Sequence, residues 1–386
     1  METPYFIFNI DLLDDNISGF KSGMKDNWPK CRLSYSVKTN SLPWLLSYLK
    51  DNDIMAEVVS DEEYKLAILC GYSEADIVFN GPIKTKECFQ RAVEKSSYVN
   101  IDSKRELEWL KECKTDNTHI GIRINVPVEL FDKNDIGYEE DGFRFGFSDE
   151  TGELSNAIEI LDTLGINGFG FHLHCNSVTR SPEVYRAIAK YAVEISEKYN
   201  LSPSFIDVGG GFFGGVPGKT TPDEYFAIIA SELGKSDNTK ESLLIAEPGS
   251  AIVGSTVDLH TSVLDTKNTA HARIVTTDGS RIHIDPLWIK SGYMHELVAK
   301  SSEVFEGKQI ICGYTCMDHD RLMTLNGKVE LQPGDEIIYR RVGAYTMTFG
   351  GPFIRYFPDV YVKDGGNITK VRSRISTEDY YKIHTV

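Results

Sequence analysis

From about residue 30 to residue 260 the chain alternates short apolar runs with longer amphipathic segments. The apolar runs are rich in β-branched and aromatic residues, which predicts strands, and the segments between them repeat apolar positions at helical spacing. The predicted strands span residues 32–37, 54–59, 76–81, 97–102, 119–126, 166–174, 204–211 and 243–249. Eight such strand–helix steps favour a closed (β/α)₈ TIM-type barrel over an open parallel sheet.

The pattern changes after residue 262. Alternating runs separated by turns such as Pro333-Gly334-Asp335 predict strands, and helical spacing nearly disappears. We therefore expect a C-terminal all-β domain, a sandwich or a barrel, over residues 263–386. The apolar run at residues 5–10 lies outside the alternation of strands and helices that predicts the barrel. Residues 1–28 are therefore predicted to form a strand of the β domain and a helix that leads into the barrel. The barrel itself is predicted over residues 29–262.

The composition of the chain argues against some classes of binding partner. The chain has 386 residues, of which 41% are hydrophobic and 25% charged, as is usual for a folded protein. A net charge of −16 makes nucleic acid and anionic membrane surfaces poor partners. No apolar run approaches the roughly 20 residues that span a bilayer. Seven cysteines without a CxxC pair predict reduced thiols, so we expect a cytoplasmic protein.

Several polar residues lie at or near the carboxyl ends of the predicted barrel strands. In such barrels the carboxyl ends of the strands face the active site. Each residue has an ordinary structural explanation, because a strand-end lysine usually points into solvent and a histidine is often a satisfied interior residue. Because all of them are expected at the same end of the barrel, they nevertheless indicate an active site there. The residues are Lys38, Arg123, His172, His174, Gly209 to Gly211 and Glu247.

The glycine triplet at residues 209–211 suggests the kind of ligand. Successive backbone N–H groups without side chains can surround an anion. The spacing matches neither a dinucleotide fingerprint nor a nucleotide-binding P-loop, which favours a single phosphate on a flat cofactor. Such a cofactor needs an imine anchor, a stacking partner and a charge partner for its ring nitrogen. Lys38, His174 and Glu247 supply those three groups, which fits pyridoxal 5′-phosphate.

Short motifs in a fixed order extend this pattern over most of the chain. They are YSVKTN at 35–40, YVNIDSKRELE at 98–108, FRFGF at 143–147, HLHCNS at 172–177, IDVGGGF at 206–212, AEPG at 246–249, CMDHD at 316–320 and GAYT at 343–346. This series resembles the fold-type III pyridoxal 5′-phosphate-dependent decarboxylases, the group that includes diaminopimelate, ornithine and arginine decarboxylases.

The resemblance implies a role for each motif residue. Lys38 would be the Schiff-base lysine and Glu247 the partner of the pyridine nitrogen, with Gly249 in the same cofactor-binding segment. His174 would stack on the ring. The remaining implied contacts are Ser177 close to the ring, Gly209, Gly210, Gly211 and Tyr345 at the phosphate, and Cys316 as the acid that returns a proton to the α-carbon. Family members are homodimers in which the cysteine segment reaches the partner's site, so composite active sites are expected.

Departures from the family pattern concern the substrate. Ser250 replaces an arginine, Met317 replaces an acid that reads the distal amine of diamine-forming substrates, and Asp318 could compensate. Arg123 is a further candidate for substrate binding. Changes of smaller effect are Arg144 for lysine and Asn176 for glycine. The acidic segment at residues 133–143 is typical of a solvated loop, and binding of a cationic group is the alternative. Diaminopimelate is the default substrate, and a less common amino acid or a larger molecule bearing an amino-acid head is the alternative.

Two other functions are compatible with parts of this pattern. Alanine racemases share the barrel and the lysine, but they place an arginine against the ring nitrogen and carry a K-A-D-A-Y-G signature that this chain lacks. Glu247 therefore favours a decarboxylase. A non-catalytic regulator resembling the antizyme inhibitors would be expected to lose cofactor contacts, whereas Lys38, His174 and Tyr345 are all present.

Overall fold

The computed structural model describes residues 1–113, 119–137 and 141–385, and the chain divides into two compact units. One unit, Asn16–Ala251, is called the barrel unit below. The other combines Met1–Asp15 with Ile252–Val386 and is called the β unit. The two ends of the chain thus belong to the same unit.

The barrel unit contains a closed ring of parallel strands. Within the described residues the ring has eight strands, in the order β2-β3-β4-β5-β6-β8-β9-β10, and β10 pairs back onto β2. The strands are β2 (Cys31–Ser36), β3 (Met55–Val58), β4 (Ile77–Phe79), β5 (Tyr98–Ile101), β6 (Ile120–Asn125), β8 (Gly170–His172), β9 (Phe205–Asp207) and β10 (Leu243–Ala246). A short strand, β7 (Phe147–Ser148), pairs with β6. The predicted (β/α)₈ barrel is confirmed.

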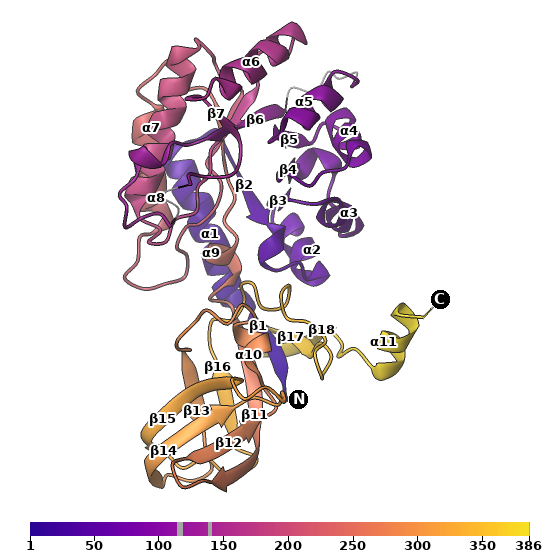
Figure 1. The fold of residues 1–386 in the computed structure, drawn as a ribbon, viewed down its shortest axis with the longest axis vertical. Helices are drawn as coiled ribbons and strands as arrows, with labels where there is room; N and C mark the ends of the chain where they lie inside the picture. The colour runs from indigo at the N-terminus through magenta and orange to yellow at the C-terminus, as the bar shows by residue number, and fades with distance from the viewer. Residues whose placement is uncertain (114–118, 138–140, 386) are drawn as a thin grey trace. The chain divides into compact units, whose positions relative to one another are not determined.

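Each barrel strand is followed by a helix, and the helices lie outside the ring of strands (Figure 1). Three of them carry proline in the first turn, and Thr221 and Glu224 form a capping box on α8. The helices are α1 (Ile10–Asn27), α2 (Pro43–Asp51), α3 (Asp61–Leu69), α4 (Lys86–Glu94), α5 (Lys104–Leu110), α6 (Glu153–Thr163), α7 (Pro182–Lys198), α8 (Pro222–Leu233) and α9 (Ser250–Val253).

The barrel interior is packed with side chains. Phe205 lies in a cluster of fully or nearly fully buried residues with Tyr98 and Ile245. The ring of Phe205 occupies the space where a side chain on Gly121 or Gly170 would lie, so two neighbouring strands need glycine there. Because this end of the barrel is filled, only the other end, where the strands terminate, is available for a site.

The β unit is built on a mixed sheet with two parallel pairings. Strand β1 pairs antiparallel with β11 and parallel with β17, so the N-terminal strand lies inside this sheet. The strands are β1 (Tyr5–Asn9), β11 (Val257–Asn268), β12 (Arg273–Thr277), β13 (His295–Val298), β14 (Val304–Cys312), β15 (Arg321–Val329), β16 (Glu336–Tyr339), β17 (Asp359–Asp364) and β18 (Asn367–Arg372). The predicted C-terminal β domain is confirmed.

The β unit also contains two short helices that the sequence pattern did not predict, α10 (Arg281–Ile284) and α11 (Thr377–Ile383). Each begins at a serine whose hydroxyl accepts a hydrogen bond from a backbone N–H of its first turn. Segments of four and seven residues are too short to show helical periodicity. None of the helices in the described parts of the chain has the length and apolar character needed to cross a bilayer.

Candidate active site

Lys38 lies just beyond the end of β2, on a single helical turn formed by Val37–Thr39. Its Nζ donates a hydrogen bond to Glu57 Oε2 at 2.8 Å. Glu57 belongs to the neighbouring strand β3 and is only 1% exposed. Ser36 Oγ donates to the same carboxylate oxygen at 2.6 Å. Adjacent strands of the barrel therefore bring a lysine and a buried acid into direct contact.

The ionisation of Glu57 depends on this lysine. Burial by itself would raise the pKa of the Glu57 carboxyl, because the charged form loses its hydration. The Lys38 ammonium, together with hydrogen bonds from Lys38, Ser36 and Asn80, outweighs the burial and lowers the pKa of Glu57. The structure thus holds a buried, ionised carboxylate beside a partly exposed Lys38.

Asn80 connects this ion pair to a second buried acid. Its side-chain amide donates to Glu57 Oε1 at 3.2 Å and to Glu247 Oε1 at 2.7 Å. Its own oxygen accepts a hydrogen bond from the Asn100 amide at 2.8 Å. Since both protons and the oxygen of the Asn80 amide are engaged, its orientation is fixed. Asn80 sets the position of Glu57 relative to Glu247.

Glu247 lies in a cluster of buried titratable groups. His172, Asp207 and Glu247 offer polar atoms that all lie within 4.8 Å of one another. Burial and the neighbouring carboxylates Asp207 and Glu57 raise the pKa of Glu247 well above its usual range. Burial also raises the pKa of Asp207, to about 7. The cluster therefore lacks a positive charge, and a cation or a protonated ring nitrogen next to Glu247 would complete it.

The raised pKa of Asp207 predicts how the stability of the ligand-free protein depends on pH. An unfolded aspartate titrates near a pKa of about 4, so with a folded pKa of about 7 the folded state binds the extra proton between those values. The free energy of unfolding should therefore fall as the pH rises through this window. Urea titrations at about pH 5 and about pH 8 measure the slope.

The matched variants for this prediction are Asp207→Asn, which should reduce the slope, and Asp162→Asn, on an exposed helix face, which should leave it unchanged. An equal slope in wild type and Asp207→Asn would mean that Asp207 does not carry the effect.

His174 follows β8 and lies against the glycine loop at residues 209–211. A Cβ atom on Gly209 would lie 2.5 Å from His174 Nδ1, and one on Gly210 would lie 2.5 Å from the backbone oxygen of Glu247. The glycines therefore allow the loop to approach the His174 side chain and the Glu247 backbone. Burial, reinforced by the positive charges of Arg123 and Lys38, lowers the pKa of His174 to about 3, so the imidazole is neutral.

The same loop can receive an anion. The Gly209 N–H donates to Asp207 Oδ1 at 2.9 Å, which fixes the start of the loop. Among the described residues, the N–H groups of Gly210 and Gly211 have no protein acceptor. Two free amides beside a neutral imidazole and a buried carboxyl cluster fit a flat cofactor that carries a phosphate and a basic ring nitrogen.

Substitution of Gly209 tests the loop. Gly209→Ala should lower the free energy of unfolding by about 3 kcal/mol, because the new methyl group meets the His174 ring and the backbone has φ of +67°. Gly218→Ala is the matched control, since Gly218 has φ of +74° and no heavy atom within 4 Å of the added Cβ. It should cost only about 1 kcal/mol of backbone strain. Equal losses in urea unfolding would show that Gly209 is not in close contact with His174.

The other predicted residues of the barrel unit have protein partners. Arg123 Nη1 contacts Asp102 at 3.3 Å, and its guanidinium lies over the Phe145 ring. Ser177 Oγ accepts from the Arg180 N–H. Gly249 packs so tightly against Thr39 that a Cβ would overlap the threonine side chain, which ties the Glu247 segment to the Lys38 turn. Ser250 begins α9.

The remaining predicted residues lie in the β unit. Cys316 is an exposed free thiol, in the loop between β14 and β15 that also contains Met317 and Asp318. Tyr345 is 37% exposed and its ring lies 6.1 Å from that of Phe349. Of the acidic segment at residues 133–143, residues 138–140 lie outside the described part of the chain.

Sequence reasoning missed three residues of this network, Glu57, Asn80 and Asp207. All three lie at or just beyond the carboxyl end of a barrel strand, β3, β4 and β9 respectively. A search for every polar residue at those strand ends, including acids that resemble solvated ones, would have found them.

Comparison with known proteins agrees with this geometry. A family model described as pyridoxal-dependent decarboxylase, pyridoxal binding domain, matches residues 15–254. A diaminopimelate decarboxylase of Archaeoglobus fulgidus is 28% identical over 365 residues, covering 91% of this chain and 85% of that protein.

Solved structures share the fold. The crystal structure of diaminopimelate decarboxylase from M. jannaschii is 23% identical and covers 100% of this chain and 93% of its own, with a TM-score of 0.84. That of the Helicobacter pylori enzyme, complexed with L-lysine, is also 23% identical, covers 99% of this chain and 97% of its own, and has a TM-score of 0.82.

Proposed function

The chain belongs to the family of pyridoxal-dependent decarboxylases and uses pyridoxal 5′-phosphate; from that premise we propose that Lys38 anchors the cofactor and Glu247 faces its ring nitrogen. We further propose that the substrate is a diaminopimelate-like amino acid, or a larger molecule bearing an amino-acid head, which loses its α-carboxylate as CO₂.

The observation that carries this proposal is the continuous hydrogen-bonded path from Lys38 through Glu57 and Asn80 to Glu247. Lys38 would hold the aldehyde end of the cofactor, and Glu247 would face the ring nitrogen at the other end. Lys38 and Glu247 lie just beyond the ends of the paired strands β2 and β10, and the Asn80 amide holds Glu57 and Glu247 at a fixed separation. The lysine side chain is 45% exposed, whereas Glu57 and Glu247 are buried, so an incoming amine can reach Nζ while the acids stay dry.

When bound, pyridoxal 5′-phosphate supplies an aldehyde for the amine and a ring that accepts the electron pair left by departing CO₂. Glu247 would keep a proton on the ring nitrogen, since a buried carboxylate beside that nitrogen favours its charged form. Asp207 and His172 surround Glu247, and they would hold it in place. His174 would lie flat against the ring, since the imidazole is neutral and loses little hydration on stacking.

Glu57 would position the Lys38 amine. Because the Glu57 carboxylate stays ionised, it accepts the Nζ hydrogen bond and can hold a proton near Nζ. The free amides of Gly210 and Gly211 would bind the phosphate. Arg123 keeps positive charge near His174, which favours the neutral imidazole.

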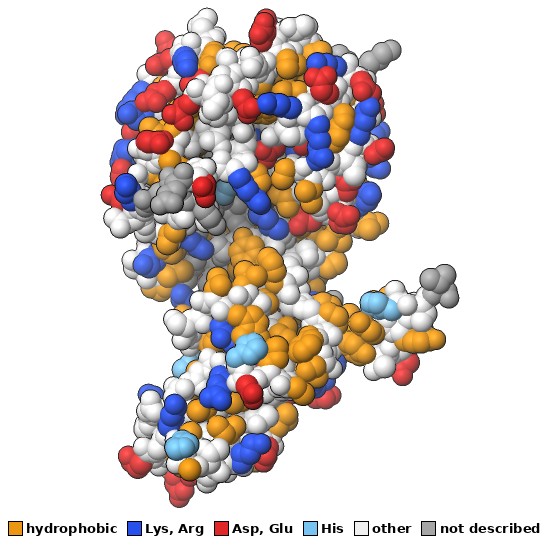
Figure 2. All heavy atoms as spheres, viewed as in Figure 1, with side chains coloured by type: hydrophobic (Ala, Val, Ile, Leu, Met, Phe, Trp, Pro, Cys, Tyr) orange, Lys and Arg blue, Asp and Glu red, His pale blue; other side chains and the backbone are white. Residues whose placement is uncertain are grey.

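We also propose that a second copy of this chain completes the site with Cys316 and Tyr345. The support is a set of exposed apolar side chains in the β unit: Tyr345, Phe349, Phe353, Ile354 and Ile289 are between 37% and 77% exposed. Figure 2 shows hydrophobic side chains gathered on the visible face of this unit, while acids and bases alternate over the barrel unit. A patch of this kind usually marks an interface.

A mixing experiment tests the composite site. Lys38→Ala and Cys316→Ala proteins should each be inactive, but the two together, unfolded and refolded as a mixture, should regain about a quarter of wild-type activity. Half of the dimers would then be mixed, and each mixed dimer would contain one intact site. Failure to regain activity, with a dimer verified by sedimentation, would place both residues in the site of one chain.

The substrate follows less directly from the residues. L-lysine is bound in the Helicobacter pylori structure, which supports an amino acid with a basic side chain. Ser250 and Met317 differ from the family pattern at positions that the resemblance assigns to substrate or cofactor binding, which supports a substrate with a different distal group.

A CO₂-release assay tests the proposed function. The cofactor-loaded protein is offered meso-diaminopimelate, L-ornithine, L-lysine, L-arginine and conjugates that carry a free amino-acid head, with Lys38→Ala as the control. Release of CO₂ together with formation of the corresponding amine supports the proposal. Inversion of the α-carbon without CO₂ would contradict it.

A further inference from the structure

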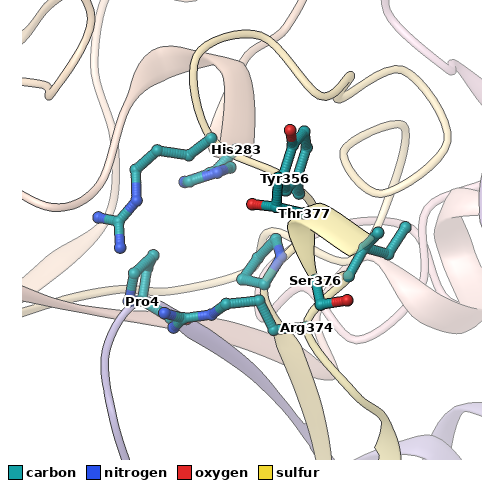
Figure 3. Close-up of a pocket in the computed structure, with 9 residues that line it drawn as sticks. Pro4, His283, Tyr356, Arg374, Ser376 and Thr377 are labelled. Atoms are coloured by element: carbon teal, nitrogen blue, oxygen red, sulfur yellow. The ribbon is translucent and has the colours of Figure 1, made fainter. Parts of the chain in front are cut away.

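The β unit contains a pocket of about 330 Å³ that the decarboxylase site does not use. The volume is within the range of small-molecule sites. Its walls come from the first residues of the chain, from α10, and from the segments before β17 and after β18. Figure 3 shows the side chains of His283 and Arg374 around it. The lining residues are Pro4, His283, Arg355, Tyr356, Pro358, Arg374, Ile375, Ser376 and Thr377.

His283 is the most unusual of these residues. It is 6% exposed, and its Nδ1 has no hydrogen-bond partner among the described residues. Its ring packs near Phe6 and Tyr314. Burial, with the positive charge of Arg355 added, lowers the pKa of His283 to about 4. A buried polar nitrogen without a partner costs free energy, so its presence at a pocket wall points to a ligand.

Arginines bring positive charge to the same pocket. In the described part of the chain Arg355 makes no ion pair, and its guanidinium lies 5.5 Å from the Tyr314 ring. Arg374 donates to the backbone oxygens of Thr3 and Pro4 at 3.2 Å, and its contact with the exposed Glu2 is 3.4 Å long.

Two carboxylates, Asp278 and Asp320, lie near this pocket, and within the described residues neither forms an ion pair with Arg355 or Arg374. Asp278 accepts a hydrogen bond from the Ser262 N–H at 2.8 Å. Asp320 accepts from Ser280, the Arg281 N–H and Thr315. Burial raises the pKa of Asp278, and the nearby positive charges of Arg355 and Arg374 oppose this rise. The chain has a net charge of −16, whereas the charged side chains that line this pocket are two arginines, so the pocket lining is locally positive.

The uncharged walls indicate the rest of the ligand. Tyr356, Pro4, Pro358 and Ile375 present apolar surface, and the pocket volume exceeds what one inorganic ion fills. Guanidinium groups match the planar or tetrahedral oxygens of carboxylates and phosphates.

We propose that this pocket binds a small metabolite through a carboxylate or phosphate group, with Arg355 and Arg374 as the ion partners and His283 as a hydrogen-bond partner. The site lies within the β unit, and the proposal does not depend on the decarboxylase reaction.

Titration calorimetry with inorganic phosphate on the cofactor-loaded protein tests the proposal. Full loading, verified by visible absorbance, keeps the probe out of the cofactor's own phosphate site. Saturable binding is expected at constant ionic strength. Arg355→Gln should weaken it about tenfold or more, the loss of one charge-assisted contact. Lys308→Gln, which removes an equal charge from an exposed strand position outside the pocket, should bind like wild type.

A second measurement uses only the wild-type protein, so it does not depend on how well a variant folds. Crystals of the cofactor-loaded wild type soaked in selenate should give an anomalous peak between Arg355 and Arg374, next to His283. Absence of saturable phosphate binding to wild type, or Arg355→Gln binding as tightly as Lys308→Gln, would overturn the proposal. A selenate peak elsewhere with none in the pocket would also overturn it.

Discussion

Lys38→Ala should lower kcat/KM by at least about a thousandfold and abolish the visible absorbance of bound cofactor. Lys38 is the only residue proposed to join the cofactor covalently, and a methyl side chain at this position cannot do so. The variant also leaves Glu57 buried without its ammonium partner, so the pKa of the Glu57 carboxyl should rise. Absorbance spectra and steady-state rates measure both effects.

Lys65→Ala is the matched control, because Lys65 is an exposed lysine on α3 of the same unit. It should keep the wild-type spectrum and rate. Retention of activity within tenfold by Lys38→Ala would remove Lys38 from the proposed chemistry. Thermal unfolding of both variants separates loss of the anchor from loss of the fold.

Glu247→Gln should lower kcat about a hundredfold or more, with a smaller change in KM. The amide has the shape of the carboxyl but no negative charge to keep the ring nitrogen protonated. Asn80 can still donate to the amide oxygen, so the geometry should survive. An effect confined to kcat would therefore report the lost charge.

The control for this variant is Glu159→Gln, an exposed acid on α6 that should behave as wild type. A shift in the absorbance spectrum of the bound cofactor in Glu247→Gln, absent from Glu159→Gln, is also expected. Equal kcat values for the two variants would show that Glu247 does not act on the ring.

The barrel could be predicted from the chain because its strands are buried on both faces and its helices are amphipathic. Those two patterns alternate eight times, and polar residues such as Lys38 and Glu247 interrupt them at corresponding places. Gly209 was recognisable since a glycine triplet after an apolar run has few structural uses. These signals are local, so they can be recognised in the sequence without knowledge of the tertiary contacts.

The buried network could not be predicted in the same way. Glu57 lies four residues before the acidic start of α3, where Asp61, Glu62 and Glu63 follow, so in the sequence it resembles one more solvated acid. Its burial arises from pairing of β2 with β3, which aligns Ser36 with Glu57. Asn80 shows its role only when β4 brings it between two carboxyls. Such roles depend on contacts between strands rather than on any local pattern.

The two short helices of the β unit were missed for a related reason. Helix α10 spans only four residues, and the segment from Arg273 to Trp288 has an alternating pattern typical of strands. A serine cap at Ser280 decides the local structure there.

Reductive trapping shows whether Lys38 carries the cofactor. Borohydride treatment of the cofactor-loaded protein, followed by proteolysis and mass spectrometry, should place a pyridoxyl group on the peptide that contains Lys38 and on no other lysine peptide. A label on a different lysine, or an unlabelled Lys38 peptide from protein that carried a full complement of cofactor, would contradict the account.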